Sequence, residues 1–499
     1  MRLHWISNTL MAVTIAVLAA LSSHLATRWA GALAYPFQLD ATEGFILEQA
    51  MTIAQGQTIY GPIDRPPFLV GNYPPLFQAI YAGVNGSKAS LWSLALGRRL
   101  TIASTILAAL LMAAIVHRMT RALAPAILAA FLFLVSYEVH QWSAFVRVDM
   151  PALAFTLGGV FAFVSSKRRW SMALAGALLA AAVYTRQTAI LAPAACAIAL
   201  AIGDRRRLAW FLGPMLGIAL AALAFLEWTS GGEFLRHIVA YNANRMDWGG
   251  WARLMKNEIW FFNRFLVVAL AAMIAARLVR GREKPPEGGA TNRRALAIYA
   301  ILGAISLLSY AKVGAAPNYV LEPLAATAIW LCAGLGALLN GQGRRAHIAA
   351  IVVCALLLIH SGWCVTRQRE MFSSPTPTAE DKRVAGELTQ YLRGVDGDLM
   401  CEEPMFTLLA GRPILFDPFI MTTLAREAKW DQTAFVHMIE KQSFARIVTC
   451  ENLAAPRPYY ERYTELMADA VRRHYRIVGG AVLPGLGREY FIYEPAKSE

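Results

Sequence analysis

The chain has 499 residues, 57% of them apolar, and a mean hydropathy of +0.42. Soluble domains contain roughly 45–50% apolar residues, so this composition excludes an ordinary soluble protein and favours a membrane protein. The net charge of +14 could suggest nucleic-acid binding. Here, however, the basic residues cluster in short loops between apolar runs, as they do in membrane proteins, and we expect no nucleic-acid partner.

Apolar runs long enough to cross a bilayer predict a polytopic, mainly α-helical bundle of about eleven transmembrane helices. We expect them near residues 8–29, 96–116, 121–136, 150–166, 170–185, 188–203, 208–228, 258–279, 294–311, 319–339 and 347–364. The first run resembles a signal peptide, but it continues through Leu25 without a clear small-residue cleavage site. We therefore expect it to be retained as a helix.

Arg- and Lys-rich loops alternate along the chain with loops that have few of these residues. The basic loops include residues 118–121, 167–169, 205–207 and 344–345. The positive-inside rule places these loops and the N-terminus in the cytoplasm. It places loops 30–95 and 229–257, and everything after the last helix, outside. The predicted location is a plasma (bacterial inner) membrane, crossed many times and in contact with membrane lipids.

The chain changes in character after the membrane part, which we assign to residues 1–366. Residues 375–499 alternate helix-like with strand-like stretches, which predicts a small extracytoplasmic α/β domain. Cys401 and Cys450 each end a strand-like run. Neighbouring parallel strands could bring the two thiols together in an oxidising compartment, so a disulfide and two separate buried thiols are both open interpretations.

Ionisable residues gather at the predicted outer ends of the helices, where they are costly and often functional. Asp40 and Glu43 follow the first helix and precede an amphipathic segment, 45–55, that is expected to lie along the membrane surface. Arg147 and Asp149 precede the fourth helix. A capping box at 40–43 and a helix cap at Asp149 are the structural alternatives.

Two further cations, Arg186 and Lys312, lie on the side where the positive-inside rule disfavours them. Arginine can bind phosphate with two hydrogen bonds, and lysine can act as a point charge. The alternative for both is that the side chain reaches the lipid head groups. A further set of aromatic, amide and acidic residues suits a sugar pocket, although an interfacial belt is an equal alternative: Tyr73, His237, Tyr241, Asn242, Asn318, Tyr319 and Glu322.

In their order and common sidedness, these segments resemble the GT-C superfamily of integral-membrane glycosyltransferases, which includes protein O-mannosyltransferases and bacterial aminoarabinose transferases. The segments are Asp40-Ala-Thr-Glu43, Asn72-Tyr-Pro-Pro-Leu-Phe77, Arg147-Val-Asp149, Arg186-Gln-Thr188 and Asn318-Tyr-Val-Leu-Glu322. The resemblance implies a polyprenyl-phosphate-linked sugar as donor and an acidic residue of the first outer loop as catalytic base. It places this role on Asp40, supported by Glu43. Similar mannosyltransferases often carry an adjacent Asp-Glu pair, whereas two residues intervene here. Which carboxylate acts, and whether a divalent metal is bound, are therefore open.

These observations predict a glycosyltransferase that transfers a hexose or pentose to an extracytoplasmic lipid, glycan or protein. Arg147, Arg186 or Lys312, with Asp149 as partner, would hold the donor phosphate. A carboxylate base would activate the acceptor for a single displacement that inverts the anomeric carbon. The alternatives are a transporter or flippase of lipid-linked sugars, an O-antigen ligase or polymerase-like enzyme, and a non-catalytic scaffold.

Overall fold

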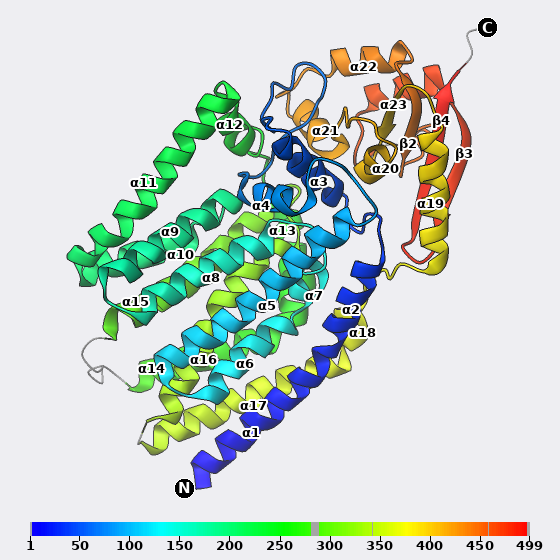
Figure 1. The fold of residues 1–499 in the computed structure, drawn as a ribbon. Coiled ribbons are helices and arrows are strands. Elements are labelled where there is room, and N and C mark those ends of the chain that lie inside the picture. Colours follow the sequence, from blue (N-terminus) through cyan, green and yellow to red (C-terminus); the bar gives the residue numbers. More distant parts are fainter. Residues whose placement is uncertain (1, 281–288, 342, 458, 497–499) are drawn as a thin grey trace.

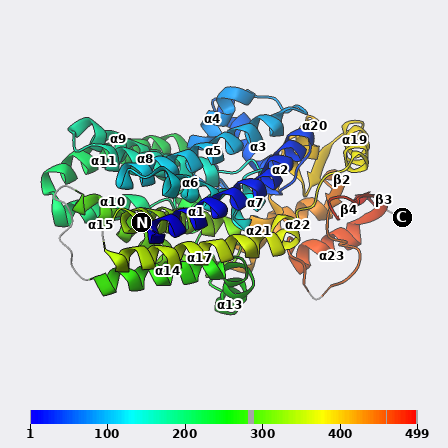
Figure 2. The ribbon, with the colours of Figure 1, turned by 90° about the horizontal axis from the view of Figure 1, so that it is seen from below.

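The computed structural model describes residues 2–280, 289–341, 343–457 and 459–496. Long helices form a bundle, and a smaller domain of helices and strands lies at one end of it (Figure 1). Seen from below, the long helices lie side by side and the smaller domain remains at their end (Figure 2). The expected fold class, a membrane helix bundle with a small C-terminal α/β domain, is confirmed.

Each helix range predicted for the bundle contains a helix in the structure. The helices are α1 (Arg2–Leu21), α2 (Ser23–Ala34), α5 (Ser93–Thr120), α6 (Leu123–Leu134), α8 (Asp149–Ser165), α9 (Arg169–Thr185), α10 (Leu191–Gly203), α11 (Arg205–Ser230), α14 (Phe261–Arg280), α15 (Ala290–Ser306), α16 (Leu321–Leu339) and α17 (Arg344–Thr366). Within the described ranges, seven helical segments are long and apolar enough to cross a membrane, and three further apolar helices are shorter. Eleven crossings therefore stay a prediction.

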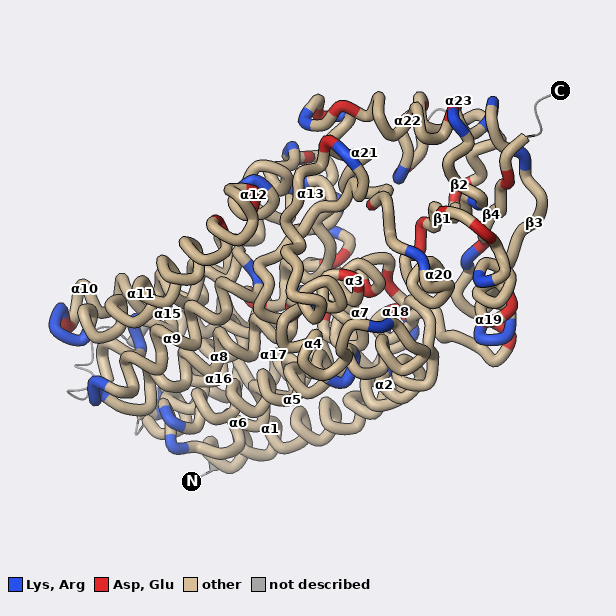
Figure 3. Tube along the Cα trace, turned by 45° about the horizontal axis from the view of Figure 1, so that its top comes forward, with Lys and Arg blue, Asp and Glu red and all other residues tan. Residues whose placement is uncertain are grey.

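Small residues allow the central helices to approach closely. A Cβ atom on Gly159 of α8 would lie 2.6 Å from Leu179 of α9, and one on Gly176 of α9 would collide with the backbone of α11 at Phe211. Close approach through glycine is a common way to pack helices in lipid, where burial of apolar surface gives little driving force. Lys and Arg also gather at the helix ends farthest from the smaller domain, where few Asp or Glu residues accompany them (Figure 3).

Short elements cover the opposite end of the bundle. They are α3 (Thr42–Ala54), α4 (Leu76–Asn85), α7 (Tyr137–Trp142), α12 (Glu233–Leu235), α13 (Trp248–Leu254), α18 (Gln368–Phe372), the π-helices η1 (Arg236–Ala240) and η2 (Met255–Trp260), and the 3-10 helices η3 (Leu307–Ala311) and η4 (Pro317–Val320). The amphipathic segment predicted at 45–55 is the helix α3, which packs against α4 and the start of α5.

The C-terminal elements, called the tail domain below, surround a four-stranded sheet. They are α19 (Ala379–Arg393), β1 (Asp398–Cys401), α20 (Pro404–Leu409), α21 (Pro418–Arg426), α22 (Thr433–Glu440), β2 (Phe444–Thr449), α23 (Glu465–His474), β3 (Tyr475–Leu483) and β4 (Arg488–Pro495). The strand order is β1-β2-β4-β3; β1 and β2 are parallel, and β4 is antiparallel to both of its neighbours. Cys401 ends β1 and Cys450 follows β2, and both are free thiols.

The tail domain packs directly on the covered end of the bundle. One apolar core joins Phe37 and Leu47 to Phe406 and Tyr490 of the tail domain. A parallel bridge pairs Phe68 with Phe416, with Phe68 N donating to Leu415 O at 2.8 Å. Because these contacts fix the tail domain against the loops around α3, the tail domain forms part of whatever site those loops carry.

Candidate active site

The loop between α2 and α3, which carries Asp40, is held by the buried residues Glu43 and Arg98. Arg98 binds both carboxylate oxygens of Glu43, at 2.9 and 2.7 Å, and donates to the carbonyls of Ala32, Tyr35 and Phe37. Neither side chain has exposed surface. A buried ion pair of this kind needs all its hydrogen-bonding groups satisfied, and the loop carbonyls supply the remaining acceptors.

Glu43 also joins this loop to the segment that precedes α8. Its carboxylate accepts from Leu39 N at 2.8 Å and from Val146 N at 2.9 Å. Leu39 and Val146 directly precede Asp40 and Arg147 in the chain. The arrangement is not the simple capping box considered above, because Asp40 Oδ1 accepts from Thr42 N and not from Glu43 N. Glu43 therefore brings Asp40 and Arg147 together.

Asp40 and Arg147 form an ion pair, with Arg147 Nη1 2.8 Å from Asp40 Oδ1. The guanidinium also donates to the hydroxyls of Thr42 and Tyr73, at 2.9 and 3.3 Å, and lies over the ring of Trp142. The two side chains are 20% and 11% exposed, so each keeps a surface that a ligand can reach.

Asp149 connects this pair to the second predicted cation. Its carboxylate is 3.3 Å from Arg147 Nε and 2.9 Å from Arg186 Nη1, and it accepts from Asn318 Nδ2 at 2.8 Å. Arg186 also donates to the carbonyl of Asn318 and lies over the ring of Tyr319. The structure thus brings Asp40, Arg147, Asp149, Arg186 and Asn318, from four distant chain segments, into one network.

A cavity of about 300 Å³ opens beside this network. Its wall on the bundle side includes Asp40, Tyr73, Arg147, Asn242, Lys312, Asn318 and Tyr319. Burial and the nearby Arg186 guanidinium lower the pKa of Lys312 below its usual value. A volume of this size suits a small polar ligand, and a cluster of cations suits an anionic one.

The opposite wall comes from the tail domain and was not predicted from the sequence. It includes Glu402, Asp417, Glu461 and Arg462. Arg462 donates to Glu402 at 3.0 Å, and Asp417 caps the start of α21 with its carboxylate accepting from Ile420 N. Burial raises the pKa of Asp417 to about 6. No sequence pattern identifies which tail loop faces the bundle, because the bridge between Phe68 and Phe416 sets that orientation.

Six of the predicted site residues do not line this cavity: Glu43, Asp149, Arg186, His237, Tyr241 and Glu322. Asp149 and Arg186 contact the lining residues Arg147 and Asn318 instead. Glu43 is enclosed by Arg98 and two backbone amides, as described above. His237 is fully buried and holds the loop between α3 and α4, with Nδ1 2.9 Å from Gly71 N and Nε2 2.7 Å from Gly61 O. Tyr241 packs against the core of the tail domain, and Glu322 lies in the first turn of α16.

The predicted site residues do not provide a set of ligands that suits a divalent metal. Within the ranges that the structure describes, no three His, Cys, Asp or Glu side chains come together as a metal site. Asp40 and Asp149 are each ion-paired with arginine. Divalent cations such as Mg²⁺ prefer oxygen ligands without a competing cation, so this network does not suit such an ion.

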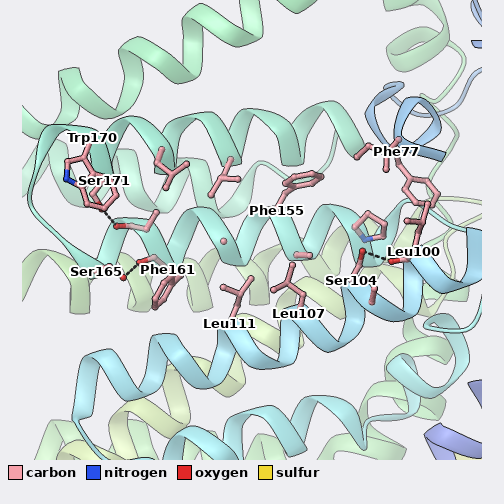
Figure 4. A pocket seen from close by; sticks show the side chains of 18 residues that line it. Phe77, Leu100, Ser104, Leu107, Leu111, Phe155, Phe161, Ser165, Trp170 and Ser171 are labelled. Carbon is pink, nitrogen blue, oxygen red and sulfur yellow. Dashed lines mark hydrogen bonds between the residues drawn. The ribbon is translucent and has the colours of Figure 1, made fainter. Parts of the chain in front are cut away.

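A second cavity, of about 560 Å³, is an apolar groove along the bundle. Figure 4 shows its side chains, which come from α4, α5, α8 and α9. One end is formed by Phe77, Leu100 and Pro151, and the other by Ser165 and Trp170. Pro151 and Ser165 are 14 positions apart on α8, which corresponds to about 21 Å, most of the thickness of a hydrocarbon core. Pro151 is two residues from Asp149, so the groove ends near the cation network.

Comparison with known proteins identifies the fold. No family model matches the chain, and no curated protein matches it. ArnT from Cupriavidus metallidurans, in the apo state, matches with a TM-score of 0.57 and 12% identity, over 96% of this chain and 97% of that one. ArnT bound to undecaprenyl phosphate matches over the same shares, with a TM-score of 0.56 and 13% identity.

A third solved structure leads to the same class of protein. The archaeal oligosaccharyltransferase AglB from Archaeoglobus fulgidus, in complex with an inhibitory peptide and a dolichol-phosphate, matches with a TM-score of 0.57 and 12% identity, over 89% of this chain and 70% of that one. These proteins are GT-C glycosyltransferases, and the chain is a multi-pass membrane protein with the GT-C fold. The resemblance seen in the sequence is therefore confirmed for the fold.

Proposed function

We propose that this protein is a glycosyltransferase that moves a sugar from a polyprenyl-phosphate donor to an acceptor on the outer face of the membrane. The observation that carries the proposal is the ion pair between Asp40 and Arg147 at the wall of a cavity that also contains Lys312. A carboxylate and several cations in one cavity provide a base and a phosphate site. The basic helix ends far from the tail domain support a cytoplasmic position for that end of the bundle.

The donor phosphate would bind to Arg147, Arg186 and Lys312. These cations stabilise the negative charge that grows on the phosphate as the bond between its oxygen and the anomeric carbon breaks. A phosphate at this site competes with Asp40 for the Arg147 guanidinium, which leaves the Asp40 carboxylate available for the acceptor. Polyprenyl phosphate leaves as an anion, and no general acid is needed to protonate it.

Asp40 would act as the general base. It takes the proton from an acceptor hydroxyl or amine while the acceptor oxygen or nitrogen forms its bond to the anomeric carbon. General-base work of this kind typically contributes roughly 10²–10⁴-fold in rate. A single displacement inverts the configuration of that carbon. Tyr73, Asn242, Asn318 and Tyr319 line the same cavity and supply hydrogen-bonding and aromatic groups for the sugar.

The apolar groove would hold the polyprenyl chain of the donor. Its lining is almost entirely apolar and includes Gly158, its outer end lies near the cation network, and ArnT is a fold relative that was solved with undecaprenyl phosphate bound. Gly158→Leu adds a side chain inside the groove, where a Cβ meets only Leu178 and Leu111 at 3.5 and 3.9 Å. Gly213→Leu on α11, where a Cβ meets nothing within 4 Å, is the matched control.

Binding of two chain lengths tests the donor class. We expect the purified protein to bind undecaprenyl phosphate at least tenfold more tightly than geranyl phosphate. Gly158→Leu should remove most of that difference, and Gly213→Leu should preserve it. Equal binding of both lipids by the unmodified protein would contradict a polyprenyl donor. Transfer of radiolabelled sugar from a polyprenyl-phosphate donor to cell-envelope acceptors tests the reaction itself, since a transporter would bind the donor and transfer nothing.

A further inference from the structure

The loop that carries Asp40 is held from the tail domain as well as from the bundle. Gln38, which is 1% exposed, accepts from Met405 N at 2.6 Å through its side-chain oxygen. Its side-chain nitrogen donates to the carbonyls of Asp40 and Ala41, at 3.2 and 3.1 Å. One glutamine therefore connects the first turn of α20 to the backbone of Asp40.

Arg488, the first residue of β4, holds the two residues before Asp40. Its guanidinium donates to the carbonyl of Gln38 at 3.0 Å and to that of Leu39 at 2.5 Å. The same guanidinium is fixed by the Glu403 carboxylate at 2.5 Å. Glu403 is 6% exposed in its side chain and follows Glu402, which lines the cavity. One residue of the last strand thus reaches across about 450 positions to the loop that carries the proposed base.

Gly44 shows that this contact leaves no spare room. A Cβ atom there would lie 2.8 Å from Pro404 Cβ and 3.0 Å from Met405 N, and would collide with the side-chain oxygen of Gln38. The start of α20 therefore packs so closely against the first turn of α3 that only glycine, which has no side chain, fits at position 44.

We infer that Arg488 is a positioning residue for Asp40, so that the tail domain completes the catalytic loop. The inference rests on the proposed function. Arg98 holds the loop carbonyls up to Phe37, and Arg488 and Gln38 hold those from Gln38 to Ala41. Without Arg488, the carbonyls nearest Asp40 on its N-terminal side lose their donor, while the pair between Glu43 and Arg98 is untouched. A displacement of about 1 Å at a reacting group can reduce turnover by roughly 10²-fold.

Arg488→Ala in the full-length protein tests this inference, with Arg476→Ala as the matched control. Arg476 is also a tail-domain arginine paired with a glutamate, Glu494 at 2.7 Å, but it lies on β3, is 57% exposed and contacts no part of the loop. We expect Arg488→Ala to lower kcat for sugar transfer by roughly 10–100-fold, with the Kd for undecaprenyl phosphate changed less than threefold. Arg488→Lys should recover part of kcat, and Arg476→Ala should leave both quantities unchanged.

Amide hydrogen exchange across residues 38–43 provides a readout that needs no sugar transfer. It should become faster in Arg488→Ala and stay unchanged in Arg476→Ala, which separates failure of this inference from failure of the proposed function. If Arg488→Ala has the same amide exchange rate across residues 38–43 and the same kcat as the unmodified protein, the inference is overturned. An equal loss of lipid binding and turnover would also overturn it, because that pattern indicates general damage. If Arg488→Ala does not fold, Glu403→Gln is the alternative variant, because it keeps Arg488 and removes only its carboxylate partner. It should show a smaller fall in kcat and a smaller rise in amide exchange across residues 38–43.

Discussion

Arg98 and Glu43 form an ion pair with no exposed side-chain surface, with 2.7 Å between Arg98 Nη2 and Glu43 Oε2. The pair lies beneath two loops and not inside the cavity, and Glu43 accepts from a backbone amide in each loop. The neighbouring residues of those loops, Asp40 and Arg147, meet as a consequence. The buried pair therefore supports the site without facing the ligand.

Glu43→Gln should destabilise the protein strongly. It leaves the Arg98 charge buried without its counter-charge, and breaking a buried pair in this way costs about 3–5 kcal/mol. Thermal unfolding in detergent should therefore show a clear fall in Tm, whereas Asp40→Asn, at a more exposed site, should leave Tm nearly unchanged. A Glu43→Gln protein with normal Tm and no turnover would assign Glu43 to the chemistry.

Lys312→Met should weaken binding of undecaprenyl phosphate by about tenfold or more, because a hydrogen bond to a charged group contributes roughly 1.5–3 kcal/mol. Lys429→Met is the control, since Lys429 pairs with Glu427 at 2.7 Å and does not line the cavity. Lipid binding by titration in detergent measures both. If both variants weaken lipid binding equally, Lys312 contributes only through its long-range charge and not through a contact with the phosphate.

A double variant can separate the proposed phosphate contact of Arg186 from its ion pair with Asp149. Arg186→Gln would remove the proposed phosphate contact and also leave Asp149 with one fewer cation, so both lipid affinity and Tm should fall. Adding Asp149→Asn removes the buried charge that lost its partner. The double variant should recover Tm and not lipid affinity. Recovery of lipid binding in the double variant would mean that Arg186 only neutralises Asp149.

Asp417→Asn should stabilise the protein at neutral pH and not in acid. The folded-state pKa of Asp417 is about 6, above the usual 3.8. The folded protein therefore retains this proton to a higher pH, and ionisation opposes folding increasingly from about pH 4 to about pH 6. At pH 7 the variant should be more stable by about 1–3 kcal/mol. Unfolding at pH 4 and pH 7 measures this, and a pH-independent difference would contradict it.

The sequence was sufficient to predict the bundle and much of the network. Apolar run length located the helices, and charges at one end of several runs identified Asp40, Arg147, Asp149 and Arg186. The same argument applies to Arg98, which lies at the start of a helix on the side where cations are disfavoured, but its position within a basic pair beside an apolar run gave no sign of its partner Glu43.

Other features depend on contacts that sequence patterns do not encode. His237 and Tyr241 occur among aromatic and amide residues that suit a sugar pocket, yet they hold the first loop and the tail domain. Glu402, Asp417 and Arg462 reach the cavity because the tail domain docks through the bridge between Phe68 and Phe416. A periodic pattern identifies elements and their buried faces, whereas this docking depends on individual side chains.

Single-turnover transfer by Asp40→Asn, started from protein already loaded with a radiolabelled polyprenyl-phosphate sugar, tests the central claim most directly. We expect the rate to fall by roughly 10²–10⁴-fold, with the affinity for undecaprenyl phosphate equal to or above that of the unmodified protein, since Arg147 then keeps only one anionic partner, Asp149. Transfer at the unmodified rate would show that Asp40 is not the base.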